Sequence, residues 1–308
     1  GITLAEMGRL EEAEENYRKA IKINSNFDEV YFNLGLMFYE SNQFQKAIEE
    51  FKLTNFGKSK NYLLRCYYLR KEKSLFSKLL DDLINQGEVN AMIGSLCTRS
   101  KLKYGVEKAN LFCEDPISYV LSINLNTKYE FDKIFINPAM KILNENILPY
   151  REQSLLTNGK QTAGNIFNYK NDYIKEIERI IRSEIENYKL NFKDSSEGLI
   201  KCWPKEYNIS GWLISMKSGS QIKPHMHENG WLSGSVYINV PAKKETNSGN
   251  LVVCIEDDKF LETNIENPKK IIPVETGSLA LFPASLLHYT IPFESEKERI
   301  VLPRSWRR

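Results

Sequence analysis

The spacing of hydrophobic residues changes along the chain. Apolar positions recur every three or four residues through residues 60–87 and 89–105, which predicts a helix pair followed by one more helix. The same spacing returns over residues 171–192, where isoleucines form one stripe and predict a long helix. From residue 199 onward apolar and polar residues alternate in short segments, a period typical of strands. The predicted strands cover residues 199–203, 211–217, 221–227, 233–240, 250–256, 270–274, 278–282, 287–291 and 299–302.

These strands are short, follow turn-forming residues and do not alternate with helices, which favours an antiparallel sandwich or barrel over a parallel α/β sheet. The segments 110–120 and 148–167 carry turn-forming residues and are expected to be loops. The pattern therefore predicts an α+β chain. A helical domain over residues 1–108 precedes a double-stranded β-helix, or jelly roll, over residues 109–308.

A period of 34 residues is visible near the start of the chain. Residues 1–25 align with residues 35–59, so that Gly1 matches Gly35 and Tyr17 matches Phe51. A small residue facing an aromatic one lets two antiparallel helices approach closely. The segment resembles the tetratricopeptide repeat (TPR), a helix–turn–helix unit. That resemblance implies a surface for a peptide or partner protein, and bracing of the next domain or self-association is an equally open interpretation.

Composition excludes several classes of protein. The formal net charge of +2 gives no support for a nucleic-acid partner or an acidic membrane surface. No run of 18 apolar residues exists, so a membrane span is not expected. Five widely spaced cysteines without a C-x-x-C pair argue against a disulfide framework or a zinc ribbon. Reduced cysteines fit the cytosol, so the chain is expected to be cytoplasmic.

Both ends of the sequence carry an expectation of their own. The chain begins with Gly1 inside a helical pattern, which is typical of a fragment. The basic segment 303–308 at the other end is expected to be frayed or foreign to the fold.

Histidine is scarce, and its placement points to metal chemistry. The chain has three histidines, and two of them are the alternate-residue pair His225 and His227. Residues two apart on a strand project to the same face. His288 lies on a predicted strand near the other end of the β region, and a β-helix can bring the two strands face to face. Because imidazole is the commonest metal ligand, the three histidines predict a metal site.

The stretch around these histidines resembles a bacterial and phage family of Fe(II)- and 2-oxoglutarate-dependent oxygenases. The resemblance covers roughly residues 110–302. Its recurring features are an H-x-H, a following S-G with an aromatic strand, and a later F-P…H…P…R. In this chain they correspond to His225, His227, Ser233-Gly234, Tyr237, Phe282-Pro283, His288, Pro292 and Arg299.

The resemblance implies Fe(II) held by histidines, 2-oxoglutarate and O2 as cosubstrates, and hydroxylation of a C–H bond. It also implies that Arg299 grips the distal carboxylate of 2-oxoglutarate, for which a planar guanidinium is suited. Tyr237 and Asn239 alternate with apolar neighbours and could line the polar pocket. The competing interpretations are a surface ion pair of Arg299 with a nearby glutamate, and a simply buried Tyr237.

One position departs from the usual pattern. Most such oxygenases carry a carboxylate two residues after the first histidine, where this chain has His227. Either three histidines bind the metal, or His227 lies outside the coordination shell and water completes it. A third, neutral ligand leaves the iron site one charge more positive. Glu228 would point away from the metal on a regular strand.

Two rival functions remain open. The first is a cupin, another double-stranded β-helix. The cupin motif has the same spacing as Gly219 and His225, but it requires a glutamate where this chain has Trp231 or Leu232. A non-enzymatic TPR adaptor with a structural metal would normally need four ligands. Helical repeats joined to an oxygenase favour a peptide or protein substrate by analogy, and a small-molecule substrate is not excluded.

Overall fold

The computed structural model describes residues 1–261 and 265–307, which form two compact units. The first unit comprises residues 1–88 and 104–109, and the second comprises residues 89–103 and 110–308. The boundary predicted between residues 108 and 109 stays a prediction. The two units are divided differently from that boundary, because most of the helix over residues 91–104 belongs to the second unit.

The first unit is entirely helical, in agreement with the predicted class. The predicted helix pair over residues 60–87 is confirmed as α5 and α6. The helices are α1 (Ile2–Glu6), α2 (Leu10–Ile23), α3 (Asp28–Glu40), α4 (Phe44–Phe51), α5 (Ser59–Leu69) and α6 (Lys73–Asn85).

The small-against-aromatic packing inferred from the repeat is present between α3 and α4. Gly35 and the Phe51 ring are both buried. A Cβ added to Gly35 would lie 2.6 Å from the ring carbon Cε1 of Phe51. No side chain larger than hydrogen fits at that distance without a shift of the ring. The glycine therefore sets how closely the two helices approach.

The second unit contains the remaining elements. Its helices are α7 (Ala91–Tyr104), α8 (Asn137–Asn144), α9 (Asp172–Asn191) and α10 (Gly198–Lys201), with short helical turns at Pro116–Tyr119, Leu125–Thr127, Asp132–Ile136, Ile166–Asn168 and Asp258–Phe260. Its strands are β1 (Leu121–Asn124), β2 (Tyr150–Arg151), β3 (Leu156–Thr162), β4 (Asn208–Gly211), β5 (Ile214–Ile222), β6 (Gly230–Asn239), β7 (Leu251–Cys254), β8 (Lys269–Ile272), β9 (Ser278–Pro283), β10 (Leu287–Thr290) and β11 (Arg299–Arg307).

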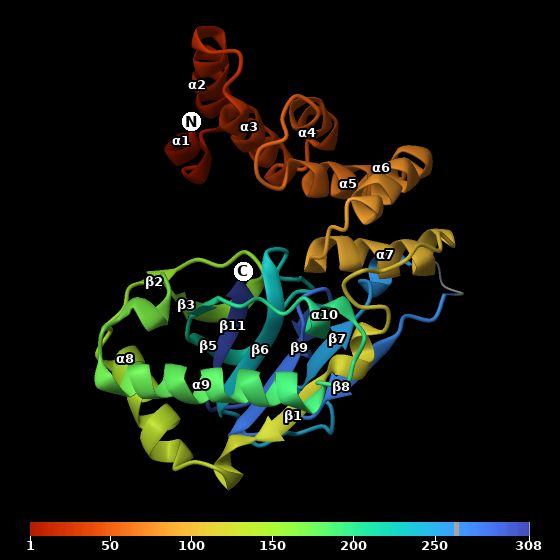
Figure 1. Ribbon diagram of the computed structural model, residues 1–308. Helices are drawn as coiled ribbons and strands as arrows, with labels where there is room; N and C mark the ends of the chain where they lie inside the picture. Colours follow the sequence, from red (N-terminus) through yellow and green to blue (C-terminus); the bar gives the residue numbers. More distant parts are fainter. Residues whose placement is uncertain (262–264, 308) are drawn as a thin grey trace. The chain divides into compact units, whose positions relative to one another are not determined.

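Two antiparallel sheets confirm the predicted α+β class with a β-sandwich. The larger sheet has the order β1-β9-β6-β11-β5-β3-β2, with β4 also paired to β11, and the smaller sheet has the order β10-β7-β8. Buried side chains of β6, β9 and β11 meet those of β7 and β8 in one core, as expected when two sheets pack face to face. On its other face the larger sheet is covered by α9, which runs across it in Figure 1.

Several sequence-based expectations were wrong in detail. Residues 199–203 were predicted as a strand, but Gly198–Lys201 form helix α10, because a short apolar run does not distinguish a strand from a buried helical turn. The segments 110–120 and 148–167, expected to be loops, contain β2 and β3 and a short helical turn that leads into β1. The predicted strand over residues 221–227 ends at Ile222.

The expectation of a frayed C-terminal segment was also wrong for residues 303–307, and Arg308 lies outside the described residues. Pro303 to Arg307 continue β11, which pairs with β6 along most of its length and with β4 at its end. Trp306 and the side chain of Arg304 are buried beneath this strand's neighbours. Basic composition alone therefore does not indicate an exposed end when alternate residues are inserted into a sheet.

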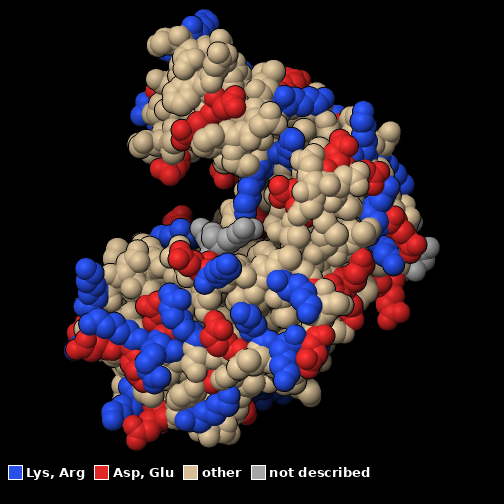
Figure 2. Space-filling model, viewed as in Figure 1, with Lys and Arg blue, Asp and Glu red and all other residues tan. Residues whose placement is uncertain are grey.

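The surface that α9 contributes carries both signs of charge. Three ion pairs with spacings of three or four residues follow the helix, Asp172–Lys175, Glu176–Arg179 and Glu178–Arg182. Figure 2 shows basic and acidic side chains interspersed over this part of the molecule. No helix in the described parts of the chain is long and apolar enough to cross a bilayer.

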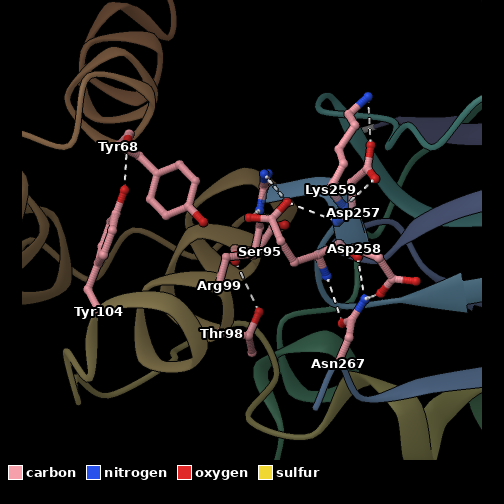
Figure 3. A network of polar contacts seen from close by, with 10 residues as sticks. Tyr68, Ser95, Thr98, Arg99, Tyr104, Asp257, Asp258, Lys259 and Asn267 are labelled. Atoms are coloured by element: carbon pink, nitrogen blue, oxygen red, sulfur yellow. Dashed lines mark hydrogen bonds and ion pairs between the residues drawn. The ribbon is translucent and has the colours of Figure 1, made fainter. Parts of the chain in front are cut away.

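A buried ion pair ties α7 to the end of β7. Arg99 Nε and Nη2 donate to the two carboxylate oxygens of Glu256 at 2.9 and 2.6 Å. The Asn267 side chain pairs with the backbone of Glu256 and also donates to Asp258 at 2.7 Å. Figure 3 shows Arg99 beside the segment that carries Asp257, Asp258 and Lys259. The bidentate geometry fixes the position of α7 relative to the segment after β7.

We expect Glu256→Gln to destabilise the second unit by about 3–5 kcal/mol, because it leaves the buried Arg99 charge without its counterion. Arg99→Met combined with Glu256→Leu should recover most of that loss. Lys259→Ala, which removes an exposed ion pair, is the control and should cost less than about 1 kcal/mol. Urea unfolding followed by tryptophan fluorescence measures this unit alone, since all four tryptophans lie in it. Equal losses for Glu256→Gln and the control would contradict the expectation.

Candidate metal centre

The fold brings all three histidines of the chain together. One ring nitrogen from each of His225, His227 and His288 lies within 4.8 Å of the other two. The ring centroids are 4.2 Å apart for His225 and His288, 4.9 Å for His227 and His288, and 5.4 Å for His225 and His227. Small side-chain shifts would suffice to bring three imidazoles onto one ion.

A two-way backbone contact sets this arrangement. The His225 amide donates to the His288 carbonyl at 3.2 Å, and the His288 amide donates to the His225 carbonyl at 2.8 Å. His288 lies on β10 of the smaller sheet, whereas His225 lies in the connection between β5 and β6 of the larger one. Met226 points to the opposite side, where it packs against Cys254 and Leu287. Alternation therefore holds at the histidine pair, although the pair lies outside a regular strand.

Each imidazole is oriented differently. His225 Nδ1 lies 2.9 Å from the backbone oxygen of Lys223. His227 Nδ1 lies 3.0 Å from Ser233 Oγ. His288 Nδ1 is buried and has no hydrogen-bond partner among the described residues. Its ring packs against Phe282 with centroids 4.9 Å apart. An unpartnered buried ring nitrogen fits a metal ligand, because a buried polar atom is otherwise costly.

Burial also favours the neutral form of two of the imidazoles, those of His225 and His288. The pKa of His288 is held well below its ordinary value, first by burial and then by the neighbouring His225 and His227. Burial likewise lowers the pKa of His225, against the opposing effect of its backbone hydrogen bonds. Only a neutral imidazole offers a lone pair to a metal. The environment of these rings therefore fits a metal ion.

A pocket of mixed polarity opens beside the three histidines. Its walls include Trp212, Ile214, Ser235, Tyr237, Leu251 and Thr290. Tyr237 is buried, which raises the pKa of its hydroxyl to about 12, against the opposing charge of Arg299. Trp231, in contrast, belongs to the core beneath α9 and donates to the Leu199 carbonyl at 2.9 Å.

Arg299 is not among the residues that line this pocket, but it contacts Tyr237, which is. Its guanidinium carbon is 5.0 Å from the Tyr237 ring centre and 5.6 Å from that of Phe293, and the side chain is only 1% exposed. Nη1 donates to the Gly249 carbonyl, whereas Nε and Nη2 are buried without a partner among the described residues. Two guanidinium nitrogens without a partner on a buried cation fit a carboxylate. The surface ion pair considered for Arg299 is excluded by its burial.

Asn239 does not join the pocket. Its side-chain nitrogen donates to the Glu298 carbonyl at 2.6 Å, so it anchors the start of β11 instead. Sequence reasoning missed the residue that supports Arg299 from the other side. Asn250 is buried, and its side-chain oxygen accepts from the Val274 amide at 3.2 Å and from Lys243. These contacts fix the turn whose Gly249 carbonyl holds Arg299. The turn-forming residues around Asn250 were the only signal in the sequence. The residues that Asn250 contacts come together only in the folded chain.

The ligand set is made of imidazoles. Among the described residues, the group able to hold a metal consists of the three histidines, without Glu228 or a cysteine. Cys254 lies nearby in the β7–β10 pairing, but burial raises the pKa of its thiol to about 12 and its side chain packs against Met226. A closed structural zinc site needs four ligands. Three ligands with open positions instead suit a reactive metal.

Comparison with known families confirms the resemblance drawn from the sequence. Residues 210–303 match the 2OG-Fe(II) oxygenase family, and residues 1–41 match the TPR repeat family. The first match contains all three histidines and Arg299. The cofactors that this family implies are Fe(II), 2-oxoglutarate and O2, as predicted. Comparison with curated proteins gives no match.

Solved structures to which the chain is similar include two prolyl hydroxylases and an epimerase. A prolyl-4-hydroxylase from Pseudomonas putida is 12% identical, with a TM-score of 0.43, over 61% of this chain and 92% of its own. A prolyl hydroxylase from Trichoplax adhaerens, solved with a hypoxia inducible factor peptide fragment, is 11% identical, with a TM-score of 0.42, over 71% and 90%. The epimerase SnoN, solved with Fe3+, alpha ketoglutarate and nogalamycin RO, is 10% identical, with a TM-score of 0.43, over 61% and 78%. These TM-scores are below 0.5, so no role of the chain is inferred from the three structures.

We expect Gly249→Ala to weaken 2-oxoglutarate binding about tenfold, equivalent to about 1.4 kcal/mol. Gly249 has a φ of +70°, and a Cβ there would lie 2.6 Å from Arg299 Nη1, so the guanidinium must move. Gly219→Ala is the matched control, because Gly219 has a φ of +76° but open space around its Cβ position. Titration of the iron-loaded protein with 2-oxoglutarate measures the affinity. Equal affinities for the two variants would show that the Gly249 contact does not position Arg299.

Proposed function

We propose that the chain is an Fe(II)- and 2-oxoglutarate-dependent dioxygenase that hydroxylates a C–H bond. The observation that carries the proposal is the convergence of His225, His227 and His288 at one pocket. Arg299 contacts Tyr237 in the wall of that pocket. In this proposal the three imidazoles hold the iron, and Nε and Nη2 of Arg299 donate to the distal carboxylate of 2-oxoglutarate. Asn239 is left out of the cosubstrate site because its side chain is engaged elsewhere.

Iron, 2-oxoglutarate and O2, when bound, supply the oxidising chemistry, in which 2-oxoglutarate becomes succinate and CO2 and one oxygen atom enters the substrate. The residues of the chain bind, orient and exclude water. Tyr237 lines the pocket and its ring centre lies 5.0 Å from the guanidinium carbon of Arg299. The low polarity around these two buried side chains strengthens the attraction of the guanidinium for a carboxylate. Ile214 and Leu251 give the pocket apolar walls that restrict water near the metal.

The neutral ligand set has an electrostatic consequence. Three imidazoles leave both charges of Fe(II) uncompensated by the protein, whereas a carboxylate ligand would cancel one of them. The site is therefore attractive to an anionic chelating cosubstrate. Arg299 contacts Tyr237 in the pocket wall, and the burial of its guanidinium increases the effect of its charge.

We further propose that the substrate is a peptide or protein. The support is the TPR match over residues 1–41 and the helical unit that contains it, because stacked helical repeats usually bind peptide segments. The pocket beside the histidines has both apolar and hydrogen-bonding walls.

An anaerobic titration of the metal-free protein with Fe(II) and then 2-oxoglutarate tests the oxygenase site. We expect a visible charge-transfer band that requires both additions. It should be absent in His288→Ala, which loses a ligand, and should need about tenfold more 2-oxoglutarate in Arg299→Ala, which loses the carboxylate contact. Trp231→Phe, a change in the core outside the pocket, is the control and should retain the band. Iron binding without the band would favour a cupin-type site, and an absence of iron binding would favour the adaptor.

Mass spectrometry of treated peptide extracts tests the substrate class. We expect a peptide to gain the mass of one oxygen atom only when Fe(II), 2-oxoglutarate and O2 are all present, with the modification lost in Arg299→Ala. Turnover that modifies only small molecules, with no oxygen added to any peptide, would contradict the protein-substrate proposal while leaving the oxygenase intact.

A further inference from the structure

We propose that Ser233 is a positioning residue that makes His227 a metal ligand by controlling which of its ring nitrogens carries the proton. The inference rests on the proposed metal site and concerns a residue to which the sequence resemblance assigned no role. The observation is the 3.0 Å contact between Ser233 Oγ and His227 Nδ1.

The two histidines of the pair are held by partners of different chemistry. His225 Nδ1 faces a backbone carbonyl, that of Lys223, at 2.9 Å, and a carbonyl can only accept a hydrogen bond. The Nδ1 of His225 must therefore carry the proton, which leaves its Nε2 lone pair free for a metal. A hydroxyl, in contrast, can donate or accept, so the contact with Ser233 is compatible with both neutral forms of His227.

Only one of these two forms can bind a metal through Nε2. When Ser233 donates to Nδ1, the proton lies on Nε2 and blocks coordination. When Nδ1 donates to Ser233, Nε2 carries a lone pair that can bind a metal. Metal binding through Nε2 therefore selects the second arrangement and rotates the hydroxyl hydrogen away from the ring. The number of protons on the pair is unchanged.

Ser233 is well placed for this role because its backbone is rigid. It lies in β6, paired with Phe282 of β9 on one side and with Ser305 of β11 on the other, and its side chain is fully buried. His227 lies outside a strand, in the connection that leads into β6, where its carbonyl accepts from the Gly230 amide at 2.7 Å. A fixed hydroxyl can thus orient a ring whose own backbone is not part of the sheet.

Removal of the hydroxyl should raise the cost of the metal-binding form. With alanine at position 233, Nδ1–H of His227 would lose the oxygen that accepts its hydrogen bond in a buried setting. Loss of such an outer hydrogen bond typically costs about 10–100-fold in metal affinity. The effect should fall on the metal-bound state, since the metal-free protein can adopt the other neutral form.

The test is an anaerobic titration of the metal-free full chain with Co(II), whose visible spectrum reports the number and geometry of its ligands. Ser233→Ala should bind Co(II) about 10–100-fold more weakly than the wild type and with an altered spectrum. Ser233→Thr, which keeps the hydroxyl, should recover most of the affinity and the wild-type spectrum. Ser285→Ala is the matched control, because Ser285 is a buried serine of the same unit whose hydroxyl has no partner among the described residues.

The outcomes separate this inference from the proposed function. Wild-type protein that fails to bind Co(II) and Fe(II) would overturn the metal site itself. Wild-type protein that binds, together with Ser233→Ala of equal affinity and spectrum, would overturn the role of Ser233 alone. Ser233→Thr that binds as weakly as Ser233→Ala, with unchanged thermal unfolding of the metal-free protein, would likewise show that the hydroxyl is not what matters.

Discussion

The site depends on one short piece of backbone pairing, the reciprocal hydrogen bonds between His225 and His288. His288 lies on β10 of the smaller sheet and His225 in the connection between two strands of the larger sheet, so the pairing closes the sandwich at this point. Side chains on the same side of an antiparallel pair lie close together, so the two imidazoles face each other once the backbones are joined. His227, two residues further along, then needs only an extended backbone to reach the same side.

Arg299 represents the opposite kind of constraint, a charge placed where the fold gives it little compensation. Its guanidinium lies near two aromatic rings and donates to one backbone carbonyl, and its Nε and Nη2 have no partner among the described residues. Such a residue costs stability in the absence of an anion. Binding of a dianionic ligand near Arg299 would offset that cost, which explains why an arginine stands at this position next to the pocket residue Tyr237. The unpartnered nitrogens of Arg299 therefore lower the stability of the free protein and also provide the proposed binding site for a carboxylate.

The sequence predicted the chemistry of this site better than its architecture. Histidine spacing and the sparse use of histidine predicted the cluster, because alternation survives even where the strand is irregular. The role of Asn250 could not be predicted, since its value lies in contacts with Val274 and Lys243 that only the folded chain provides. The strand β11 was predicted too short because Pro303 and Arg304 interrupt the apolar alternation. Helix α10 was missed because four residues are too few to show a period.

The reciprocal pairing at His225 and His288 also bears on how the second unit unfolds. These residues bracket β6 to β9, a long continuous part of the sandwich. An ion bound by histidines at both ends of that segment would act as a cross-link, closing a large loop in any partly unfolded chain and reducing its conformational entropy. The metal would then contribute to the cohesion of the sandwich as well as to catalysis. Loss of iron would leave the two sheets joined at this end only by backbone hydrogen bonds and side-chain packing.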